Sequence, residues 1–578
     1  MLNLQNSLSH LQLVPHGILA VIGVGVTFIL LTYLTSTIQG ARIAHRKPNG
    51  SQPPTLPYLI PVLGHLPEFL SNTKKFMARV TAQYGPSVPV QVRLLTRRMS
   101  ILKGAQNVTA LFRSSRKLES ERWLVQVLIN GFGVEPADTP FYLADDTGVG
   151  LQPDPKSTMS NPEHRIFFLV YRSAHGGLTG HSLDALLARF VQNLSTNIVG
   201  ASDIKDEWTE LPDIYAPCVR SMAWRASVGS IFGSHILKFI PTIEEDFWSF
   251  DSHLPPLLKE IPRWLAPESY RARDKLRSNF IKWEASAAEK YAEQGLAHDE
   301  REWEEYFGSK MMRTRHQFFK KTPLSKESVS AENLGLMWAS TANIVPATAW
   351  MLLEVLQRPK LLQEIRRIIH PYVSWDPSDP TQTKVDIPGL CNLPLLQSLY
   401  AEVLRVHTGS VISRIPNCDD FNLGGWNFAK DQPIIVSAYH VGRDETVWNQ
   451  GTAEDPHPLD VFWPERFIVY PDDPHSGPVL KSKRQEQYEK KDTAPRFSLD
   501  GTAGAWVPYG GGARMCPGRH FAKAEMIVAT ALFLTAFDIE LLTDKDSWIQ
   551  PDLKYFMFGV MHPEGKIPAR IRRRKGSQ

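Results

Sequence analysis

The sequence predicts a mainly helical fold with a smaller β part, preceded by one transmembrane helix. Two segments, Leu183–Val199 and Lys360–Ile369, place apolar residues at the spacing of a helix that buries one face. Two short apolar runs, Val88–Val92 and Ile434–Ser437, have the character of strands. The N-terminal run Gly17–Leu34 is almost entirely apolar and just long enough to cross a bilayer as a helix.

The charges around the apolar run predict its orientation in the membrane. No Lys or Arg precedes it, whereas Arg42, Arg46 and Lys47 follow it. Positive charge marks the cytosolic side, so we expect an endoplasmic-reticulum membrane protein that crosses once, with its body in the cytosol. A cleaved signal peptide, the alternative, would need a basic segment before the run. The expected parts are a lumenal N-terminus at 1–16, an anchor at 17–35, a basic and proline-rich hinge at 36–63 and the main body of the protein at 64–578.

Composition narrows the function classes. The 578 residues are 43% hydrophobic and 21% charged, as in a globular protein with a large core. The net charge of +4 gives no reason to expect a nucleic-acid partner. The four cysteines form no CxxC pair, which argues against a zinc–thiolate site or a redox dithiol. The segment 481–496 is too charged to be buried and is expected to be a mobile surface loop.

One cysteine stands in an unusual setting, within the run WVPYGGGARMCPGRHFAKAEM at 506–526. The triplet Gly510–Gly512 lets the backbone turn tightly and approach a flat ligand closely. Cys516 follows, and then Pro517 leads into an apolar, helix-forming segment. The cysteine should therefore lie at a helix N-terminus, where a thiolate is stabilised. For an isolated cysteine, a buried free thiol beside a glycine turn would be the simpler interpretation.

This run resembles the haem-binding loop of the cytochrome P450 family. The family's spaced aromatic, glycine, arginine, cysteine and glycine are matched by Tyr509, Gly512, Arg514, Cys516 and Gly518. The resemblance implies a haem b whose iron Cys516 ligates and a propionate that Arg514 binds. Thiolate ligation favours O–O cleavage. Tyr509 replaces the usual phenylalanine, and its hydroxyl needs a partner or access to water.

Two further motifs agree with the resemblance. The run LYAEVLRV at 399–406 puts Glu402 and Arg405 on one helical face, a spacing that alone is typical of surface ion pairs. The run WPERF at 463–467 resembles the P450 segment whose arginine joins that pair. The resemblance implies a buried structural triad of Glu402, Arg405 and Arg466.

Weaker haem contacts are implied at two other positions. Arg414 follows the Glu402 helix, where the family often has an arginine for a propionate. His164, in the run NPEHRIFF, resembles the start of the family's helix at the haem edge. Each of these two residues could equally be a solvated charge.

The segment 334–358 resembles the long family helix above the haem, which usually carries an acid and a threonine that deliver protons. Here Ala342 occupies the acid position and Asn343 the threonine position, and Pro346 should kink the helix. This pattern resembles the sterol hydroxylases of bile-acid synthesis, prostacyclin synthase and many fungal P450s. Asn343 is the expected catalytic residue. Alternatively, it only satisfies backbone groups that Pro346 frees.

The resemblance implies a monooxygenase that acts on a lipophilic substrate such as a sterol, a terpenoid or another secondary-metabolite precursor. The sequence has no dinucleotide-binding fingerprint, so electrons from NADPH should arrive through a separate NADPH–cytochrome P450 reductase. A haem-thiolate isomerase that needs no reductase is the first alternative. The second is a haem protein that only binds ligands.

Overall fold

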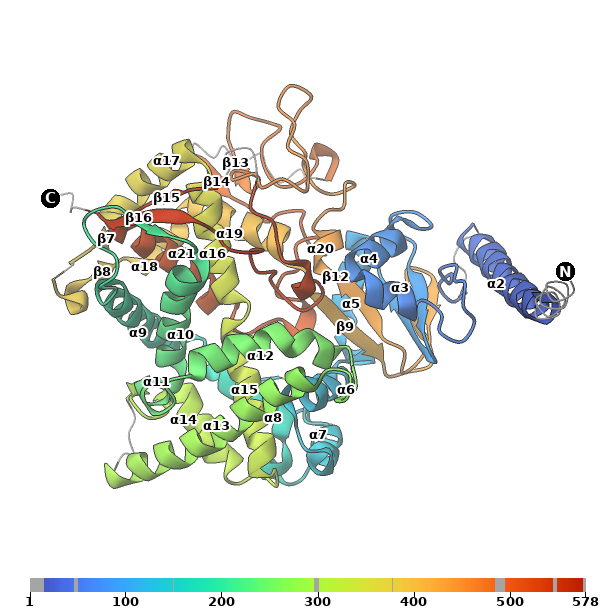
Figure 1. Ribbon diagram of the computed structural model, residues 1–578, viewed down its shortest axis with the longest axis horizontal. Coiled ribbons are helices and arrows are strands. Elements are labelled where there is room, and N and C mark those ends of the chain that lie inside the picture. The colour runs from blue at the N-terminus through green and yellow to red at the C-terminus, as the bar shows by residue number, and fades with distance from the viewer. Residues whose placement is uncertain are drawn as a thin grey trace, which may run out of the picture. The chain divides into compact units, whose positions relative to one another are not determined.

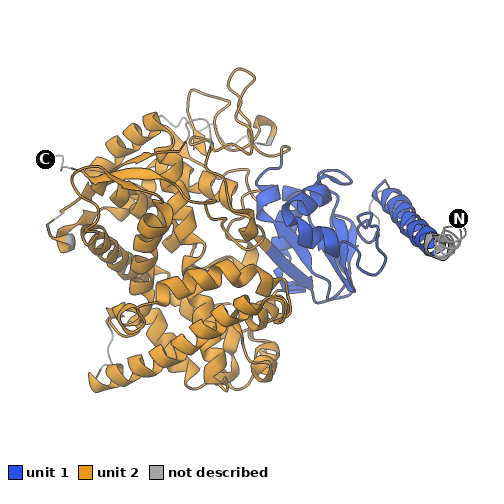
Figure 2. Ribbon diagram, viewed as in Figure 1, with its two compact units in different colours: residues 1–119, 412–444 blue, residues 120–411, 445–578 orange. Residues whose placement is uncertain are grey.

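The structure is a computed structural model that describes residues 15–45, 50–148, 150–295, 301–376, 378–483, 494–543 and 548–574 (Figure 1). The chain divides into two compact units (Figure 2). Unit 1 comprises residues 1–119 and 412–444, and unit 2 comprises residues 120–411 and 445–578. Unit 1 carries the apolar N-terminal helix and most of the larger sheet, while unit 2 contains most of the helices.

The N-terminal helix α2 spans Pro15–Ala44, so it runs through nine residues that were expected to belong to the hinge. The anchor and hinge bounds stay predictions, and no proline occurs after residue 35 to stop the helix until Pro48. The hydroxyls of Thr35 and Thr37 donate to the carbonyls four residues earlier, at 2.7 Å each, and so remain compatible with the helix. The segment Val21–Ala44 is apolar and almost uncovered, as a membrane span requires. The lumenal segment expected at 1–16 lies almost wholly outside the described residues.

Unit 1 is built on a five-stranded sheet in the order β1-β2-β12-β9-β3. Strands β1 and β2 form an antiparallel hairpin, β12 joins β2 in parallel, and β3 pairs antiparallel with β9. The other elements of unit 1 are four short helices and a small hairpin. The helices are α3 (Leu66–Ser71), α4 (Thr73–Ala82), α5 (Ala105–Arg113) and α20 (Ala438–Val441). The strands are β1 (Val90–Leu94), β2 (Arg97–Ile101), β3 (Leu118–Glu119), β9 (Val411–Pro416), β10 (Phe421–Leu423), β11 (Trp426–Phe428) and β12 (Ile434–Ser437).

Unit 2 is a helical body with several small sheets. Its helices are α6 (Glu121–Val127), α7 (Thr139–Ala144), α8 (Ile166–Gly177), α9 (Gly180–Val199), α10 (Ser221–Phe232), α11 (Ser234–Phe239), α12 (Ile243–Leu258), α13 (Pro267–Glu293), α14 (Lys310–Phe319), α15 (Lys326–Thr341), α16 (Ile344–Leu356), α17 (Pro359–Ile369), α18 (Ile387–Asn392), α19 (Pro394–His407) and α21 (Arg519–Ala536). Its strands are β4 (Thr209–Leu211), β5 (Trp303–Glu304), β6 (Gly308–Ser309), β7 (Val373–Ser374), β8 (Lys384–Val385), β13 (Ile468–Val469), β14 (Arg496–Phe497), β15 (Phe537–Leu541) and β16 (Ala569–Arg573).

The core of unit 2 lies around α16, whose residues are all buried. A helix that is apolar on every side must be surrounded by protein, and α16 packs against α19 and α21. The segment Lys326–Leu356 is also long and apolar enough to span a membrane, but most of it is buried within unit 2. It is therefore a core helix region, and it brings the expected oxygen-side residues into the interior.

The helices and strands expected from periodicity are present. Leu183–Val199 lies within α9, Lys360–Ile369 within α17, and Ile434–Ser437 is β12. Most of the charged segment 481–496 lies outside the described residues, so its mobility stays a prediction. At its far end Arg496 opposes Val469 in the β13–β14 pair.

Candidate functional site

The loop around Cys516 closes on itself just before α21. Gly510 and Gly512 have φ values of +72° and +70°, in the left-handed region that favours glycine. The Cys516 N–H donates to the Tyr509 carbonyl at 3.0 Å, which fixes the position of the cysteine. Gly518 is the N-cap residue of α21. The cysteine thus lies just before the N-terminus of a helix, as its sequence context predicts.

Cys516 is the exposed one of the four cysteines, whereas Cys218 is buried. Protein packed around its inner side raises the pKa of the Cys516 thiol, but the Gly518 backbone N–H and the Arg519 guanidinium act in the opposite direction. Burial raises the pKa of Cys218 to about 12. Cys516 therefore combines an open side with nearby donors to its sulfur, which suits a thiolate that ligates a metal.

The hydroxyl of Tyr509 has a partner inside the protein. It accepts a hydrogen bond from the Tyr400 hydroxyl at 2.9 Å, and Trp506 packs edge-on against both rings. Burial raises the pKa of both tyrosines, so both stay protonated. The departure from phenylalanine is thus matched by a second tyrosine on α19, two residues before Glu402.

Arg514 forms an ion pair with Glu121, at the start of α6. The resemblance assigns this arginine to a haem propionate, and no sequence motif indicates its carboxylate partner. A guanidinium has five N–H donors in a planar fork, more than one carboxylate can use. The propionate role of Arg514 stays a prediction.

His164 ends a short 3₁₀ turn ahead of α8 and packs edge-on against Phe141, with ring centroids 5.9 Å apart. The neighbouring Arg165 donates to the Met159 carbonyl at 3.0 Å. In the described part of the chain, the polar contact of α8 with the cysteine loop comes from Tyr171, whose hydroxyl donates to the Ala513 carbonyl at 3.4 Å. The haem-edge role of His164 stays a prediction.

Arg414 lies on β9 and is buried in unit 1. It donates to the Ser413 carbonyl at 2.8 Å and stacks over the Phe112 ring, 5.6 Å from its centroid. Burial lowers the pKa of the guanidinium. Arg414 is therefore not simply a solvated charge, and its propionate role stays a prediction.

The structure brings Glu402, Arg405 and Arg466 together, with all three side chains fully buried. Arg405 donates to both carboxylate oxygens at 2.7 and 2.8 Å, and Arg466 donates to Oε1 at 3.0 Å. Burial alone would raise the pKa of Glu402, but the two arginines lower it to about 2. The Trp463 N–H also donates to Oε1, at 3.0 Å. This is a buried, charge-assisted network rather than a surface ion pair.

The expected kink at Pro346 is a break between two helices. Helix α15 ends at Thr341 and α16 begins at Ile344. Proline has no N–H to donate to the carbonyl four residues earlier, which is that of Ala342. The helical bonding resumes at Ala347, whose N–H donates to the Asn343 carbonyl at 3.2 Å.

Asn343 ties this break to the C-terminal part of the chain. Its Oδ1 accepts a hydrogen bond from the Val560 N–H at 2.9 Å. A Cβ at Gly559 would collide with Oδ1, so the loop can approach only because residue 559 is glycine. Asn343 thus satisfies a backbone N–H of a distant loop. The buried Thr341 hydroxyl donates to the Met337 carbonyl at 2.7 Å and is occupied there.

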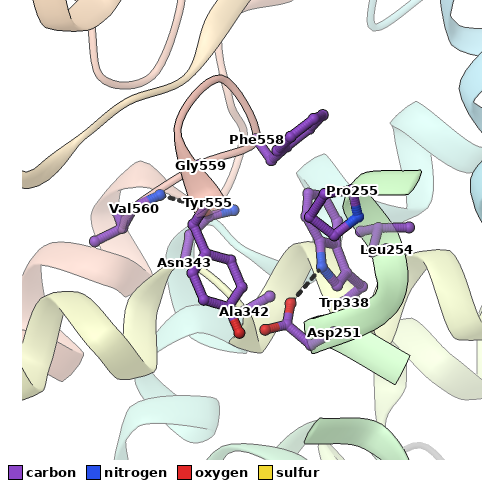
Figure 3. A pocket seen from close by; sticks show the side chains of 10 residues that line it. All are labelled: Asp251, Leu254, Pro255, Trp338, Ala342, Asn343, Tyr555, Phe558, Gly559 and Val560. Carbon is purple, nitrogen blue, oxygen red and sulfur yellow. Dashed lines mark hydrogen bonds between the residues drawn. The ribbon is translucent and has the colours of Figure 1, made fainter. Parts of the chain in front are cut away.

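A small cavity lies beside the break, between α12, the α15–α16 junction and the C-terminal loop (Figure 3). Its volume, about 10 Å³ open to the centre of a water-sized sphere, is that of roughly one water molecule. The lining residues are Asp251, Leu254, Pro255, Trp338, Ala342, Asn343, Tyr555, Phe558, Gly559 and Val560.

Comparisons with known proteins bear on what this arrangement does. The sequence profile described as Cytochrome P450 matches residues 225–569. The chain belongs to the cytochrome P450 family. A relative, Cytochrome P450 monooxygenase efuG of Hormonema carpetanum, is 37% identical over 96% of this chain and 97% of its own length. Another, Cytochrome P450 monooxygenase fsoE of Humicola fuscoatra, is 37% identical over 91% of this chain and 88% of its own.

More distant P450s are also similar. The 25-hydroxycholesterol 7-alpha-hydroxylase of Rattus norvegicus is 24% identical over 72% of this chain and 89% of its own length. The solved structure titled "Retinoic acid bound cyanobacterial CYP120A1" shares the fold, with a TM-score of 0.61 and 18% identity over 91% of this chain and all of that one. The predicted mainly helical P450 fold is confirmed. The chain is thus a P450 monooxygenase, and P450s bind haem through a cysteine thiolate on the iron.

This P450 also buries an acid for which the haem-loop motif implies no role. Glu525 lies on α21, where it accepts a hydrogen bond from the Ser227 hydroxyl of α10. Its second oxygen, Oε2, has no hydrogen-bond partner among the described residues. Burial raises the pKa of Glu525 to about 8, against roughly 4.3 in an unfolded chain.

Replacing Glu525 by glutamine should stabilise the protein at neutral and alkaline pH. Because the folded-state pKa is raised, the wild type loses stability as pH rises from about 4 toward about 8, by roughly 5 kcal/mol over this range. Glutamine stays neutral and still accepts from Ser227, so the loss should disappear. The loss is measured as the difference in the free energy of unfolding by urea between about pH 5 and about pH 8. The exposed Glu289, changed to glutamine, is the control. Parallel pH profiles of wild type and Glu525→Gln would contradict the prediction.

Proposed function

We propose that Cys516 is the axial ligand of the haem iron, and that the chain is a membrane-anchored monooxygenase of lipophilic substrates. The observation that carries the assignment is the exposed thiol at the mouth of α21, with the Gly518 N–H and Arg519 beside it. The thiolate is the soft donor that haem iron takes from cysteine, so the loop fits the cofactor.

Other residues of the chain would hold the rest of haem b. Arg514 is the candidate for one propionate and Arg414 for the other, and His164 is the candidate for the haem edge. Tyr509, held by Tyr400, would support the loop behind the sulfur. When bound, the haem supplies the oxygen chemistry, because thiolate ligation favours O–O cleavage.

The proposed substrate class is a sterol, a terpenoid or another secondary-metabolite precursor. It is supported by the similarity to fungal P450 monooxygenases and, more remotely, to enzymes named for cholesterol and 25-hydroxycholesterol. The P450 family implies a redox partner. We infer that it is NADPH–cytochrome P450 reductase, which would meet the basic residues Arg172, Arg519 and Lys523.

The test is product formation with and without NADPH, oxygen and added reductase. A monooxygenase needs all three, and its turnover with reductase should weaken as salt screens the basic face. Full turnover without NADPH and reductase would instead establish the isomerase alternative. The motive for this alternative is Ala342, which replaces the acid that usually delivers protons to oxygen. Haem binding with no product from any lipid fraction would favour a ligand-binding protein.

Deleting residues up to Gly40 should release at least part of the protein from the membrane fraction while leaving haem binding intact. The reason is that α2 exposes its apolar side chains and contributes no residue to the cysteine loop. Fractionation of the full-length and shortened proteins, each with its CO spectrum, measures this. Protease protection of the haem domain in sealed microsomes would contradict the proposed cytosolic orientation in the endoplasmic reticulum.

Asn343→Ala should lower the ratio of product to NADPH consumed, with more hydrogen peroxide released. The carboxamide can hold water at the helix break, and alanine cannot. Its Oδ1 also binds the Val560 N–H, so some loss of stability is expected as well. Asn343→Thr should restore part of the coupling. If Asn343→Ala lowers only the folding yield and the ratio is unchanged, Asn343 is a structural link and the catalytic assignment fails.

A further inference from the structure

The cavity beside Asn343 contains a buried carboxylate that the proposed oxygen chemistry does not use. Asp251, on α12, lines the cavity with a side chain that is 4% exposed. Its Oδ1 accepts a hydrogen bond from the Trp338 indole N–H at 2.9 Å. Its Oδ2 lies 3.3 Å from His562 Nε2. Among the described residues, no hydrogen bond to Oδ2 meets the geometric criteria for one. A carboxylate oxygen has two lone pairs, so Oδ2 can accept from a ligand as well as from a neighbouring side chain.

The residues around Asp251 hold it in place. Figure 3 shows the Tyr555 hydroxyl directed toward the carboxylate, and the Tyr555 ring stacks on His562 at 4.0 Å. His562 is itself fixed by the Tyr215 hydroxyl, 2.8 Å from Nδ1. Burial and the nearby Asp251 raise the pKa of Tyr555, which therefore stays a donor. The acceptor is thus held on packed elements rather than on a free loop.

Asn343 supplies the complementary group on the opposite wall. Because its Oδ1 accepts from the Val560 N–H, the side-chain amide nitrogen is the group with which Asn343 would donate to a ligand in the cavity. The cavity therefore presents an acceptor from Asp251 and a donor from Asn343. Its volume of about 10 Å³ admits an oxygen atom the size of water and not a ring or a branched chain.

We propose that this pocket binds the hydroxyl group of a lipophilic alcohol, and so orients the substrate by that group. The proposal rests on the proposed monooxygenase function and specifies its substrate class. A hydroxyl can donate to Asp251 and accept from Asn343 at once. A ketone could not donate to the carboxylate, and an ammonium could not accept from the amide. The apolar side chains of Leu254, Pro255 and Phe558 suit the carbon atom that carries the hydroxyl.

The experiment compares matched alcohols and hydrocarbons as ligands of the full-length holoenzyme. The probes are 25-hydroxycholesterol, cholesterol and cholestene, with triterpene and diterpene alcohols and their deoxy hydrocarbons. Binding is measured by the substrate-induced spectral shift and by equilibrium dialysis, which needs no haem signal. We expect an alcohol to bind roughly 10–100-fold more tightly than its hydrocarbon, the range for a hydrogen bond to a charged group.

Asp251→Asn should abolish that preference, because it puts an amide donor where the hydroxyl donates while keeping an acceptor for Trp338. The matched control is Asp246→Asn on the same helix, whose carboxylate binds Lys275 and Asn279 instead. The control should keep the preference. If Asp251→Asn does not fold, the wild-type comparison still decides.

The outcomes separate this inference from the function on which it rests. Equal affinity for alcohols and hydrocarbons, no binding of any alcohol, or an unchanged preference in Asp251→Asn would overturn the hydroxyl pocket. Each of those results leaves the haem assignment standing if the CO spectrum is that of a thiolate. Loss of the thiolate spectrum in the wild type would instead defeat the proposed function, whatever the dialysis shows.

Discussion

Cys516→Ala should reduce product formation to the background of the assay while the protein still folds. The thiol is exposed, so its removal leaves no buried cavity, and its N–H bond to Tyr509 is a backbone bond that alanine keeps. What is lost is the sulfur donor to the iron. Turnover and haem content of the purified variant, with far-UV circular dichroism for folding, are the measurements.

The matched control is Cys391→Ala, on α18. Cys391 is half-buried and burial raises the pKa of its thiol to about 11, so it is not expected to ligate the iron. Its replacement should leave turnover nearly unchanged. If Cys516→Ala kept wild-type turnover while Cys391→Ala lost it, the ligand would be misassigned.

Glu402→Ala should destabilise the protein by about 3–5 kcal/mol, because it leaves two buried guanidinium groups without their counter-charge. Arg405 and Arg466 are fully buried beside Glu402, so water cannot compensate for its loss. The expected phenotype is a low yield of haem-containing protein, measured by urea unfolding and haem content. Glu540→Ala is the control, since its pair with Arg570 is on the surface and should contribute less than about 1 kcal/mol.

The same triad predicts acid sensitivity. The folded pKa of Glu402 is about 2, below the unfolded value of roughly 4.3, so its contribution is present above the unfolded pKa and is lost as pH falls through that range. Glu402→Gln should flatten this part of the stability profile. A Glu402→Ala protein as stable as the wild type would show that the network is not structural.

The parts of the fold that depend on local chemistry could be predicted from the sequence. The glycine turn before Cys516, the start of α21 and the same-face spacing of Glu402 and Arg405 are properties of short segments. The resemblance then supplied Arg466, which is 64 residues from Glu402 and which no local rule would select.

The remainder depends on contacts that no short segment encodes. Glu121 reaches Arg514, and Asp251 lies beside the α15–α16 junction, only once the chain has folded. Tyr400, the partner of Tyr509, lies in the run LYAEVLRV at 399–406. A tyrosine at that position is equally compatible with simple packing in an apolar core, so the run alone does not predict the hydrogen bond. The apolar run that marks the anchor does not mark the end of α2, which continues to Ala44, four residues before Pro48.

The most direct test of the central claim is the spectrum of the reduced protein with carbon monoxide, recorded for the wild type and for Cys516→His. Thiolate ligation by Cys516 predicts the red-shifted Soret band in the wild type and its loss in the variant, because imidazole is a neutral donor. A wild type without the red-shifted band, or a Cys516→His protein that keeps it, would contradict the assignment of Cys516 as the axial ligand.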